Sequence, residues 1–313
     1  MVSRVLITGA GTLGTELAKQ LLDKGYMVRV MDNSEQALWK FEERVAKPDS
    51  SRLLEMVLGD INDHNAVVRC MRRMEFVIHT AALKHVRFTN DSPVECIETN
   101  ILGTKDLILD AMRRDSVRKF IFISTDKACF PINIYGESKR VGEYLAAWAH
   151  EQSGKAFMSC RFGNYLGSSG SVIDRWKEQR ASGEILLTDP NMRRFFIKPA
   201  EVAAFVIRLM ESSDESVGKG NIYIPIMKVI DMETLSSVVA KKWGVKVKMI
   251  GKFPGEKADE VLLNQEEMSR ARIVNDILEV RKEAGTMQQM MLTSQVLPQM
   301  TTEEVEEYVK DVI

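Results

Sequence analysis

The residues of this chain best suited to acid–base chemistry lie in one stretch near its middle. Four polar residues occupy positions 124–127, and a tyrosine and a lysine, Tyr135 and Lys139, follow four positions apart. Residues with this spacing share one face of a helix. The ammonium of Lys139 would then favour the phenolate of Tyr135, lowering a pKa that is about 10 when unperturbed. The spacing predicts that Tyr135 accepts a proton near neutral pH.

Tyr-x-x-x-Lys alone is weak evidence, because many surface helices carry it, so the elements that position the pair matter. The apolar run 120–123 predicts a central strand that is covered on both faces. Its carboxyl end carries Ser124, Thr125, Asp126 and Lys127. In an open α/β sheet this edge is where ligands bind.

A glycine signature near the N-terminus predicts a dinucleotide site. Gly9, Gly11 and Gly14 follow a predicted strand at 4–8 and lead into a predicted helix at 12–24, which begins with Thr12 and Leu13. The first glycine permits a tight turn, the second lets a pyrophosphate approach the backbone, and the third lets helix and strand pack. The helix amides would bind the phosphates.

Asp32 ends the second predicted strand, eighteen positions after Gly14. A carboxylate there accepts hydrogen bonds from the adenosine ribose and repels a 2′-phosphate, which favours NAD over NADP. Arg29 lies within the strand and is no obvious phosphate partner, although neighbouring loops leave NADP open. Further predicted cofactor contacts follow later strands or lie on the helix at 93–114: Asp60, Ile61, Ala81, Ala82, Lys84 and Asn100.

Composition narrows the class of protein. The 313 residues carry 43 basic and 44 acidic side chains, so no net field attracts nucleic acid. No apolar run approaches the roughly 18 residues of a membrane span, and the N-terminus shows no signal-peptide pattern. The four cysteines and four histidines lack metal-ligand spacing. A cytoplasmic protein with reduced thiols and no metal is expected.

Alternating strands and helices over the first 160 residues predict an α/β fold, a Rossmann-type doubly wound parallel sheet. Residues 1–165 form the predicted NAD(P)-binding domain, to which 198–220 return. A smaller mixed α/β substrate lobe is predicted from 166–197 and 221–313.

Five motifs resemble the extended short-chain dehydrogenase/reductase superfamily, and within it the UDP-N-acetylglucosamine 4,6-dehydratases of polysaccharide biosynthesis. They are STDKA at 124–128, PINIYGESK at 131–139, RFGNYLGSSGSVI at 161–173, LTDPNMRRFFI at 187–197 and PGEK at 254–257. The resemblance implies a UDP-sugar substrate. It also implies cofactor contacts from Ser124, Tyr135 and Lys139, and substrate contacts from Lys84, Asn164, Ser171, Val172, Arg194, Lys252 and Glu256.

The resemblance implies a role for each catalytic residue. Tyr135, activated by Lys139, takes the proton of the sugar 4-hydroxyl, which Thr125 orients, while hydride moves from carbon 4 to NAD. Lys127 as a neutral amine removes the carbon 5 proton, Asp126 as an acid protonates the departing 6-hydroxyl, and hydride returns to carbon 6. The presence of Tyr135 resembles the inverting enzymes, which also epimerise carbon 5. The structural alternative is that Asp126 and Lys127 form a salt bridge at a strand end.

Three departures from the family pattern bear on the site. The glycine loop is one residue shorter than usual, Cys129-Phe130 replaces a small residue and Asn, and Phe253 replaces an Arg that grips the diphosphate. Either Lys252 or Arg194 supplies the missing charge, or the substrate differs from that of the family.

Two other functions remain open: a nucleotide-sugar 4-epimerase or reductase, which would not need Asp126 and Lys127, and a non-catalytic dinucleotide-binding sensor. In relatives the helices matching 93–114 and 135–151 pair across a dimer, so a homodimer or higher homo-oligomer is expected.

Overall fold

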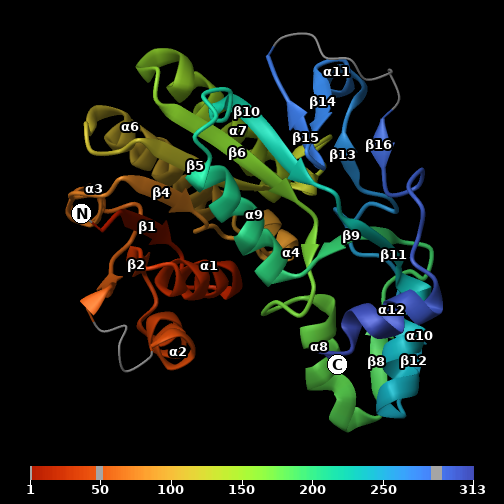
Figure 1. Cartoon of the computed structure of the whole chain (residues 1–313). Coiled ribbons are helices and arrows are strands. Elements are labelled where there is room, and N and C mark those ends of the chain that lie inside the picture. Colours follow the sequence, from red (N-terminus) through yellow and green to blue (C-terminus); the bar gives the residue numbers. More distant parts are fainter. Residues whose placement is uncertain (1, 47–51, 283–290) are drawn as a thin grey trace.

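The computed structural model describes residues 2–46, 52–282 and 291–313. Within these ranges a nine-stranded sheet runs in the order β14-β15-β10-β6-β5-β4-β1-β2-β3 (Figure 1). Its strands are β1 (Arg4–Thr8), β2 (Met27–Asp32), β3 (Leu54–Leu58), β4 (Phe76–His79), β5 (Lys119–Thr125), β6 (Ala156–Phe162), β10 (Lys219–Pro225), β14 (Ala271–Val274) and β15 (Ile277–Val280).

Seven neighbouring strands of the sheet pair in parallel: β10, β6, β5, β4, β1, β2 and β3. At one edge β15 pairs antiparallel with β10, and β14 pairs antiparallel with β15. The strand order reverses at β1, which lies between β2 and β4. In doubly wound sheets a ligand crevice opens at this reversal, beyond the carboxyl ends of the strands. The predicted Rossmann-type α/β fold is confirmed.

Helices cover both faces of the sheet, so its central strands are apolar on both sides. In β5, Ile121 and Ile123 join the core under one face, while Phe120 and Phe122 join the core under the other. The first core lies beneath α1 (Thr12–Asp23), α2 (Glu35–Val45) and α9 (Pro199–Glu211). The second lies beneath α3 (His64–Cys70), α6 (Thr104–Arg113) and α7 (Ile134–Ser153).

The predicted helix at 93–114 is interrupted by a π-helical segment. It consists of α5 (Pro93–Cys96), η2 (Ile97–Gly103) and α6, and it follows the short helix α4 (Val86–Asp91). Asn100 lies in the π-helical segment, where its carboxamide accepts a hydrogen bond from the Leu83 amide (2.8 Å) and donates to the Leu83 carbonyl (2.9 Å). π-helical turns are frequent at functional sites. Here the turn anchors the loop that follows β4.

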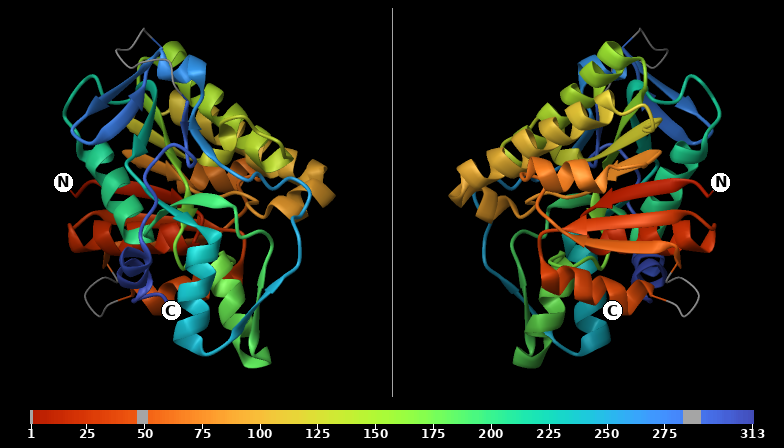
Figure 2. Two further views of the ribbon diagram at one scale, coloured as in Figure 1. Left: turned by 90° about the vertical axis from the view of Figure 1, so that its right-hand side faces the viewer. Right: turned by 90° about the vertical axis from the view of Figure 1, so that its left-hand side faces the viewer.

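Most of the remaining elements build a lobe at one end of the main sheet, with α8 and α10 farthest from it (Figure 2). Its short strands are β7 (Asn164–Tyr165), β8 (Glu184–Leu187), β9 (Arg193–Ile197), β11 (Lys228–Asp231) and β12 (Lys246–Met249). Its helices are α8 (Val172–Gln179), η4 (Arg180–Ser182), α10 (Met232–Trp243) and α12 (Thr302–Val309). Trp176 and Leu235 lie in the separate core of this lobe. The other short elements, β13 (Val261–Leu263), β16 (Leu292–Thr293) and α11 (Gln265–Met268), lie near β14 and β15 and pack against the core of the main sheet (Figure 1).

One part of the predicted domain division is wrong. Residues 221–313 were assigned to the lobe, but β10, β14 and β15 extend the main sheet. The reason is that Ile222 and Tyr223 of β10 pair in parallel with β6, where the strand is buried between helices on both faces. The rest of the division stays a prediction, and residues 283–290 of it lie outside the described residues. No helix in the described ranges is long and apolar enough to cross a membrane.

Candidate active site

A cavity of about 1140 Å³ lies along the carboxyl edge of the main sheet, between the sheet and the lobe. Its volume exceeds the roughly 300–1,000 Å³ typical of small-ligand pockets, so it has room for more than one bound molecule. Most predicted site residues line it: Gly9, Gly11, Thr12, Leu13, Asp32, Asp60, Ile61, Ala81, Ala82, Lys84, Ser124, Thr125, Lys127, Tyr135, Lys139, Asn164, Ser171, Val172, Arg194 and Glu256.

Four predicted residues do not line this cavity. Gly14 packs against the glycine loop, and Asn100 is buried beneath the loop after β4. Asp126 is fully buried behind Lys127. Lys252 does not line the cavity, although its neighbour Phe253 does. Its ammonium lies 2.7 Å from the carboxylate of Asp189, so its charge is already paired outside the cavity.

The glycine loop fits a dinucleotide. Gly9 has a φ of 97°, a left-handed conformation that glycine adopts without strain. A Cβ built on Gly11 would meet no atom within 4 Å, so the backbone there is open to the cavity. A Cβ on Gly14 would lie 2.0 Å from the Gly9 carbonyl oxygen. The loop therefore leaves space for a pyrophosphate beside the start of α1 and requires glycine where helix meets strand.

Asp32 is held at the end of β2 by backbone amides. Its carboxylate accepts hydrogen bonds from Ala10 (2.8 Å) and Ser34 (2.9 Å). Arg29 is turned away, since it donates to Glu55 at 2.6 Å and to the Cys70 carbonyl at 2.7 Å. Arg29 therefore offers no charge to a 2′-phosphate beside Asp32.

Tyr135 enters the cavity because of where α7 begins. The side chain of Asn133 caps the helix by accepting a hydrogen bond from the Gly136 amide at 2.8 Å, which places Tyr135 in the first turn. Burial is the largest influence on the phenol and raises the pKa of Tyr135 to about 12, against smaller lowering by the nearby Lys127.

The expected lowering of the Tyr135 pKa by Lys139 is not found in this arrangement. The Lys139 ammonium donates to the Ile123 carbonyl oxygen at 2.8 Å and lies 4.6 Å from the centre of the Phe122 ring. Burial lowers the pKa of Lys139 to about 8. The helical spacing places Tyr135 and Lys139 on one face of α7, but Lys139 donates its hydrogen bond to the backbone carbonyl of Ile123 in β5.

Lys127 and Asp126 form an ion pair in η3 (Asp126–Ala128), the turn that follows β5. The Lys127 Nζ atom lies 2.9 Å from Asp126 Oδ1 and 3.6 Å from Glu260 Oε1. Burial lowers the pKa of Lys127, but the carboxylates of Asp126 and Glu260 outweigh it and raise that pKa above its ordinary value. Thr125 donates to the same Asp126 oxygen at 3.0 Å.

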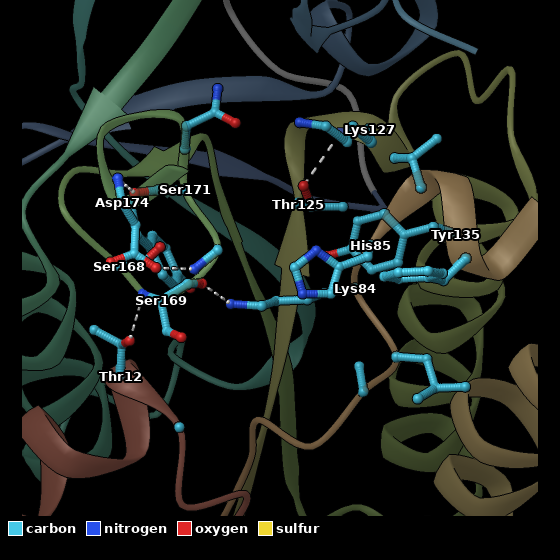
Figure 3. Close-up of a pocket in the computed structure, with 18 of the residues that line it drawn as sticks. Thr12, Lys84, His85, Thr125, Lys127, Tyr135, Ser168, Ser169, Ser171 and Asp174 are labelled. Carbon is cyan, nitrogen blue, oxygen red and sulfur yellow. Dashed lines mark hydrogen bonds between the residues drawn. The ribbon is translucent and has the colours of Figure 1, made fainter. Parts of the chain in front are cut away.

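The wall opposite these residues is the 168–171 loop (Figure 3). Lys84 reaches across and donates to the Ser169 carbonyl at 2.8 Å, while the Ser169 amide donates to Thr12 Oγ1 at 3.2 Å. The hydrogen bond between Ser169 and Thr12 thus joins the 168–171 loop to the start of α1, next to the glycine loop.

Arg194 also lines the cavity, but its guanidinium donates to backbone carbonyls, including that of Lys257 at 2.7 Å.

Sequence reasoning missed a buried charge cluster beneath the site. The Arg161 guanidinium, in β6, donates to Glu143 (2.7 Å) and to Glu267 (2.7 Å). Glu143 also accepts a 2.6 Å hydrogen bond from Ser124, so the cluster supports the end of β5. An arginine in an otherwise apolar strand was the signal that could have revealed it. Glu260 was missed too, because nothing local to its sequence distinguishes it.

This chain is similar to known proteins over most of its length. The family described as "Polysaccharide biosynthesis protein" matches residues 5–282. An "Uncharacterized membrane protein MJ1061" of Methanocaldococcus jannaschii is 36% identical over 88% of this chain and 85% of its own length. A UDP-N-acetylglucosamine 4,6-dehydratase (inverting) of Campylobacter jejuni is 34% identical, covering 84% of this chain and 78% of its own.

The X-ray structure of Pen from Bacillus thuringiensis is 31% identical and superimposes with a TM-score of 0.92, covering 99% of this chain and 98% of its own. Similar proteins include both nucleotide-sugar dehydratases and 4-epimerases. The family match over most of the chain and these identities agree with the sheet, the glycine loop and the Tyr135 site. The chain belongs to the polysaccharide biosynthesis protein family, within the extended short-chain dehydrogenase/reductases.

Proposed function

We propose that this protein is an NAD-dependent enzyme that modifies a nucleotide sugar, and specifically a 4,6-dehydratase acting on UDP-N-acetylglucosamine with inversion at carbon 5. The observation that carries the proposal is that Lys127 and Tyr135 line one cavity together with the glycine loop, with Asp126 hydrogen-bonded to Lys127. Bound NAD would supply a reversible hydride acceptor at carbon 4 of the sugar. Gly11, Thr12, Leu13 and Asp32 would hold its adenosine and phosphates.

Tyr135 accepts the proton of the sugar 4-hydroxyl in this proposal, and the Thr125 hydroxyl orients that group. Its raised pKa means that the phenol needs a nearby positive charge to ionise near neutral pH. Lys127 would supply that charge, because it already lowers the pKa of the phenol, and Lys139 holds the first turns of the helix against β5 through its hydrogen bond to Ile123.

Lys127 and Asp126 together supply the base and the acid. As an ion pair they hold one exchangeable proton on the Lys127 ammonium, 2.9 Å from Asp126 Oδ1. Transfer of that proton to Asp126 leaves a neutral amine and a carboxylic acid, with no proton gained or lost. The amine then removes the carbon 5 proton and the acid protonates the departing 6-hydroxyl.

The substrate nucleotide would lie against the lobe. Ser171 caps α8 by accepting a hydrogen bond from the Asp174 amide, so the amides of this helix face the cavity beside Val172. Helix N-termini bind phosphates. Lys84, Asn164, Arg194 and Glu256 complete the proposed contacts, and Phe253 lines the same wall.

One observation favours a second function, a nucleotide-sugar 4-epimerase. Asp126 is fully buried and the raised pKa of Lys127 keeps its side chain an ammonium, which is the arrangement of a structural salt bridge. An epimerase would use Tyr135 and Lys139 and leave that ion pair unused.

Mass spectrometry of the nucleotide sugar separates the two. Purified protein is incubated with NAD and UDP-N-acetylglucosamine, and a product lighter by one water is expected. Lys127→Ala should abolish this product, whereas Lys241→Ala, at an exposed site in α10, should not. A product of unchanged mass that proves to be the 4-epimer would overturn the dehydratase proposal and establish the epimerase.

We further propose that the protein forms a homo-oligomer through a surface formed by α4, α5, η2 and α7. Exposed large apolar side chains gather on them: Phe88, Val94, Ile97, Leu102, Tyr144 and Trp148. Because these helices pack against one another, their exposed apolar side chains favour a protein interface. Light scattering during size-exclusion chromatography should give a multiple of the 35.5 kDa chain mass, and Trp148→Glu should reduce it.

A further inference from the structure

Glu260 is a buried carboxylate that none of the roles above uses. It lies immediately before β13, and its backbone is fixed by Ser294, whose hydroxyl accepts a hydrogen bond from the Glu260 amide (3.1 Å) and whose amide donates to the Glu260 carbonyl (2.9 Å). The residue is only 3% exposed and does not line the cavity. The backbone of Glu260 is therefore held by the residue that follows β16.

The carboxylate of Glu260 is a second anionic neighbour of Lys127, in addition to Asp126. Its Oε1 atom lies 3.6 Å from Lys127 Nζ, and its Oε2 atom lies 3.7 Å from Lys257 Nζ without a hydrogen-bond partner. Asp126 Oδ2 is likewise buried without a partner. The Lys127 ammonium thus has two buried carboxylates as neighbours, and each carboxylate has one oxygen that accepts no hydrogen bond.

Four charged groups face Glu260: Lys127 and Asp126 from η3, Arg194 from β9, and Lys257 from the preceding loop. Burial raises the pKa of Glu260, and the negative charge of Asp126 adds to this against the lowering by the three cations. A carboxylate so placed takes up a proton more readily than an exposed one. When it does, Lys127 keeps one carboxylate partner instead of two.

This matters because an ammonium cannot remove a proton from carbon. We propose that Glu260 is a positioning residue of the acid–base pair: its carboxylate holds Lys127 as an ammonium, and its protonation releases Lys127 to pass a proton to Asp126. Before release the three side chains hold one exchangeable proton. Afterwards they hold two: Glu260 has taken up one from solvent, Asp126 has received the one that Lys127 held, and Lys127 is a neutral amine. The inference rests on the proposed function for its catalytic meaning.

The test measures the protonation of Lys127 without requiring turnover. The protein is treated with trace acetic anhydride at a series of pH values, and acetylation of each lysine is quantified by peptide mass spectrometry. Lys127 lines the cavity and its side chain is 21% exposed, so the reagent can reach it. In Glu260→Gln the titration of Lys127 should move to lower pH, by about one unit, which is a tenfold gain in labelling at a pH below the transition.

Matched controls separate this effect from damage to the fold. Glu260→Asp keeps the charge and should restore the wild-type direction of the titration. Glu279→Gln removes another buried carboxylate, in β15, and should leave Lys127 labelling unchanged. Glu260→Met is a second neutral variant for use if Glu260→Gln does not fold, and it should give the same shift.

An unchanged Lys127 titration in both neutral variants overturns the inference. Failure of the proposed function is a separate result, because it appears as a wild-type protein that forms no dehydrated product whatever the labelling shows. If the product forms, exchange of the carbon 5 hydrogen with deuterated solvent should also begin at lower pH in Glu260→Gln.

Discussion

The ammonium of Lys139 donates its hydrogen bond to the carbonyl oxygen of Ile123, 2.8 Å away, across the gap between α7 and β5. This contact fixes the first turns of α7 against the strand whose end carries Thr125. The lysine thereby positions two groups of the site at once, the helix with Tyr135 and the end of β5.

Lys139→Met should therefore reduce activity by roughly 10²- to 10⁴-fold, the range for loss of an acid–base contribution. The hydrogen bond that fixes the first turns of α7, and with them Tyr135, against β5 is removed, while the apolar stem is kept. Steady-state kinetics with the nucleotide sugar gives kcat, and thermal unfolding checks the fold. Activity within twofold of wild type would mean that Lys139 serves packing alone.

Tyr135→Phe should lose turnover by about 10²- to 10⁴-fold with little change in stability. The ring is kept and only the hydroxyl that accepts the substrate proton is removed. Absorbance at the wavelength of reduced nicotinamide should show no transient in the variant. A transient of wild-type size would assign the first proton transfer to another residue.

Alanine substitutions at two glycines of the glycine loop should have different effects, one on NAD binding and the other on stability. Gly11→Ala adds a Cβ that meets no protein atom, so the chain should fold normally but bind NAD at least tenfold more weakly. Gly14→Ala places a Cβ 2.0 Å from the Gly9 carbonyl oxygen and should cost about 1–3 kcal/mol of stability. Calorimetric NAD titration and urea unfolding separate the effects. Equal NAD affinity of Gly11→Ala and wild type would show that the pyrophosphate does not lie against Gly11.

The Arg161 cluster should matter greatly for stability. Arg161 is 1% exposed between Glu143 and Glu267, so Arg161→Met leaves two buried carboxylates without their cation. The loss should be about 3–5 kcal/mol in the free energy of unfolding. Lys241→Met breaks the exposed pair with Glu306 and should change stability by no more than about 0.5 kcal/mol. Similar values for both variants would contradict this account.

His79 should make the fold sensitive to acid. The ring is fully buried, with Nδ1 2.6 Å from the Thr8 hydroxyl and Nε2 2.8 Å from the Thr104 hydroxyl. Burial, aided by the Lys139 charge, lowers the pKa of His79 from 6.5 to about 3. The folded state therefore binds fewer protons than the unfolded state between these pH values, so stability is lost as pH falls below 6.5.

The expected loss from His79 between pH 7 and pH 4.5 is about 3 kcal/mol. His79→Gln keeps a donor and an acceptor for Thr8 and Thr104 but does not titrate, so it should lose less stability over this range. Urea unfolding of both proteins at the two pH values gives the difference. Equal losses would show that carboxylates alone cause the acid sensitivity.

Much of the fold and of the candidate site could be predicted because the signals are local. The strand–loop–helix around Gly9 follows from backbone freedom at one turn, and the strand ending at Thr125 follows from a run of apolar residues. Side chains at the carboxyl ends of parallel strands must meet at one edge of the sheet. That is why Asp32 and Lys127, far apart in sequence, were both expected at the cavity and both line it.

The tertiary structure decided what depends on charge pairing and on the path of the chain. It added β10, β14 and β15 to the main sheet, paired Lys252 with Asp189, and brought Glu260 to Lys127. Hydrophobic periodicity indicates only which face of a helix or strand is buried. The partner of a charged side chain is set by which distant segment packs beside it. The sequence by itself therefore determined the sheet edge and the polar residues that lie there, and only the folded chain decided that Glu260 joins Asp126 beside Lys127.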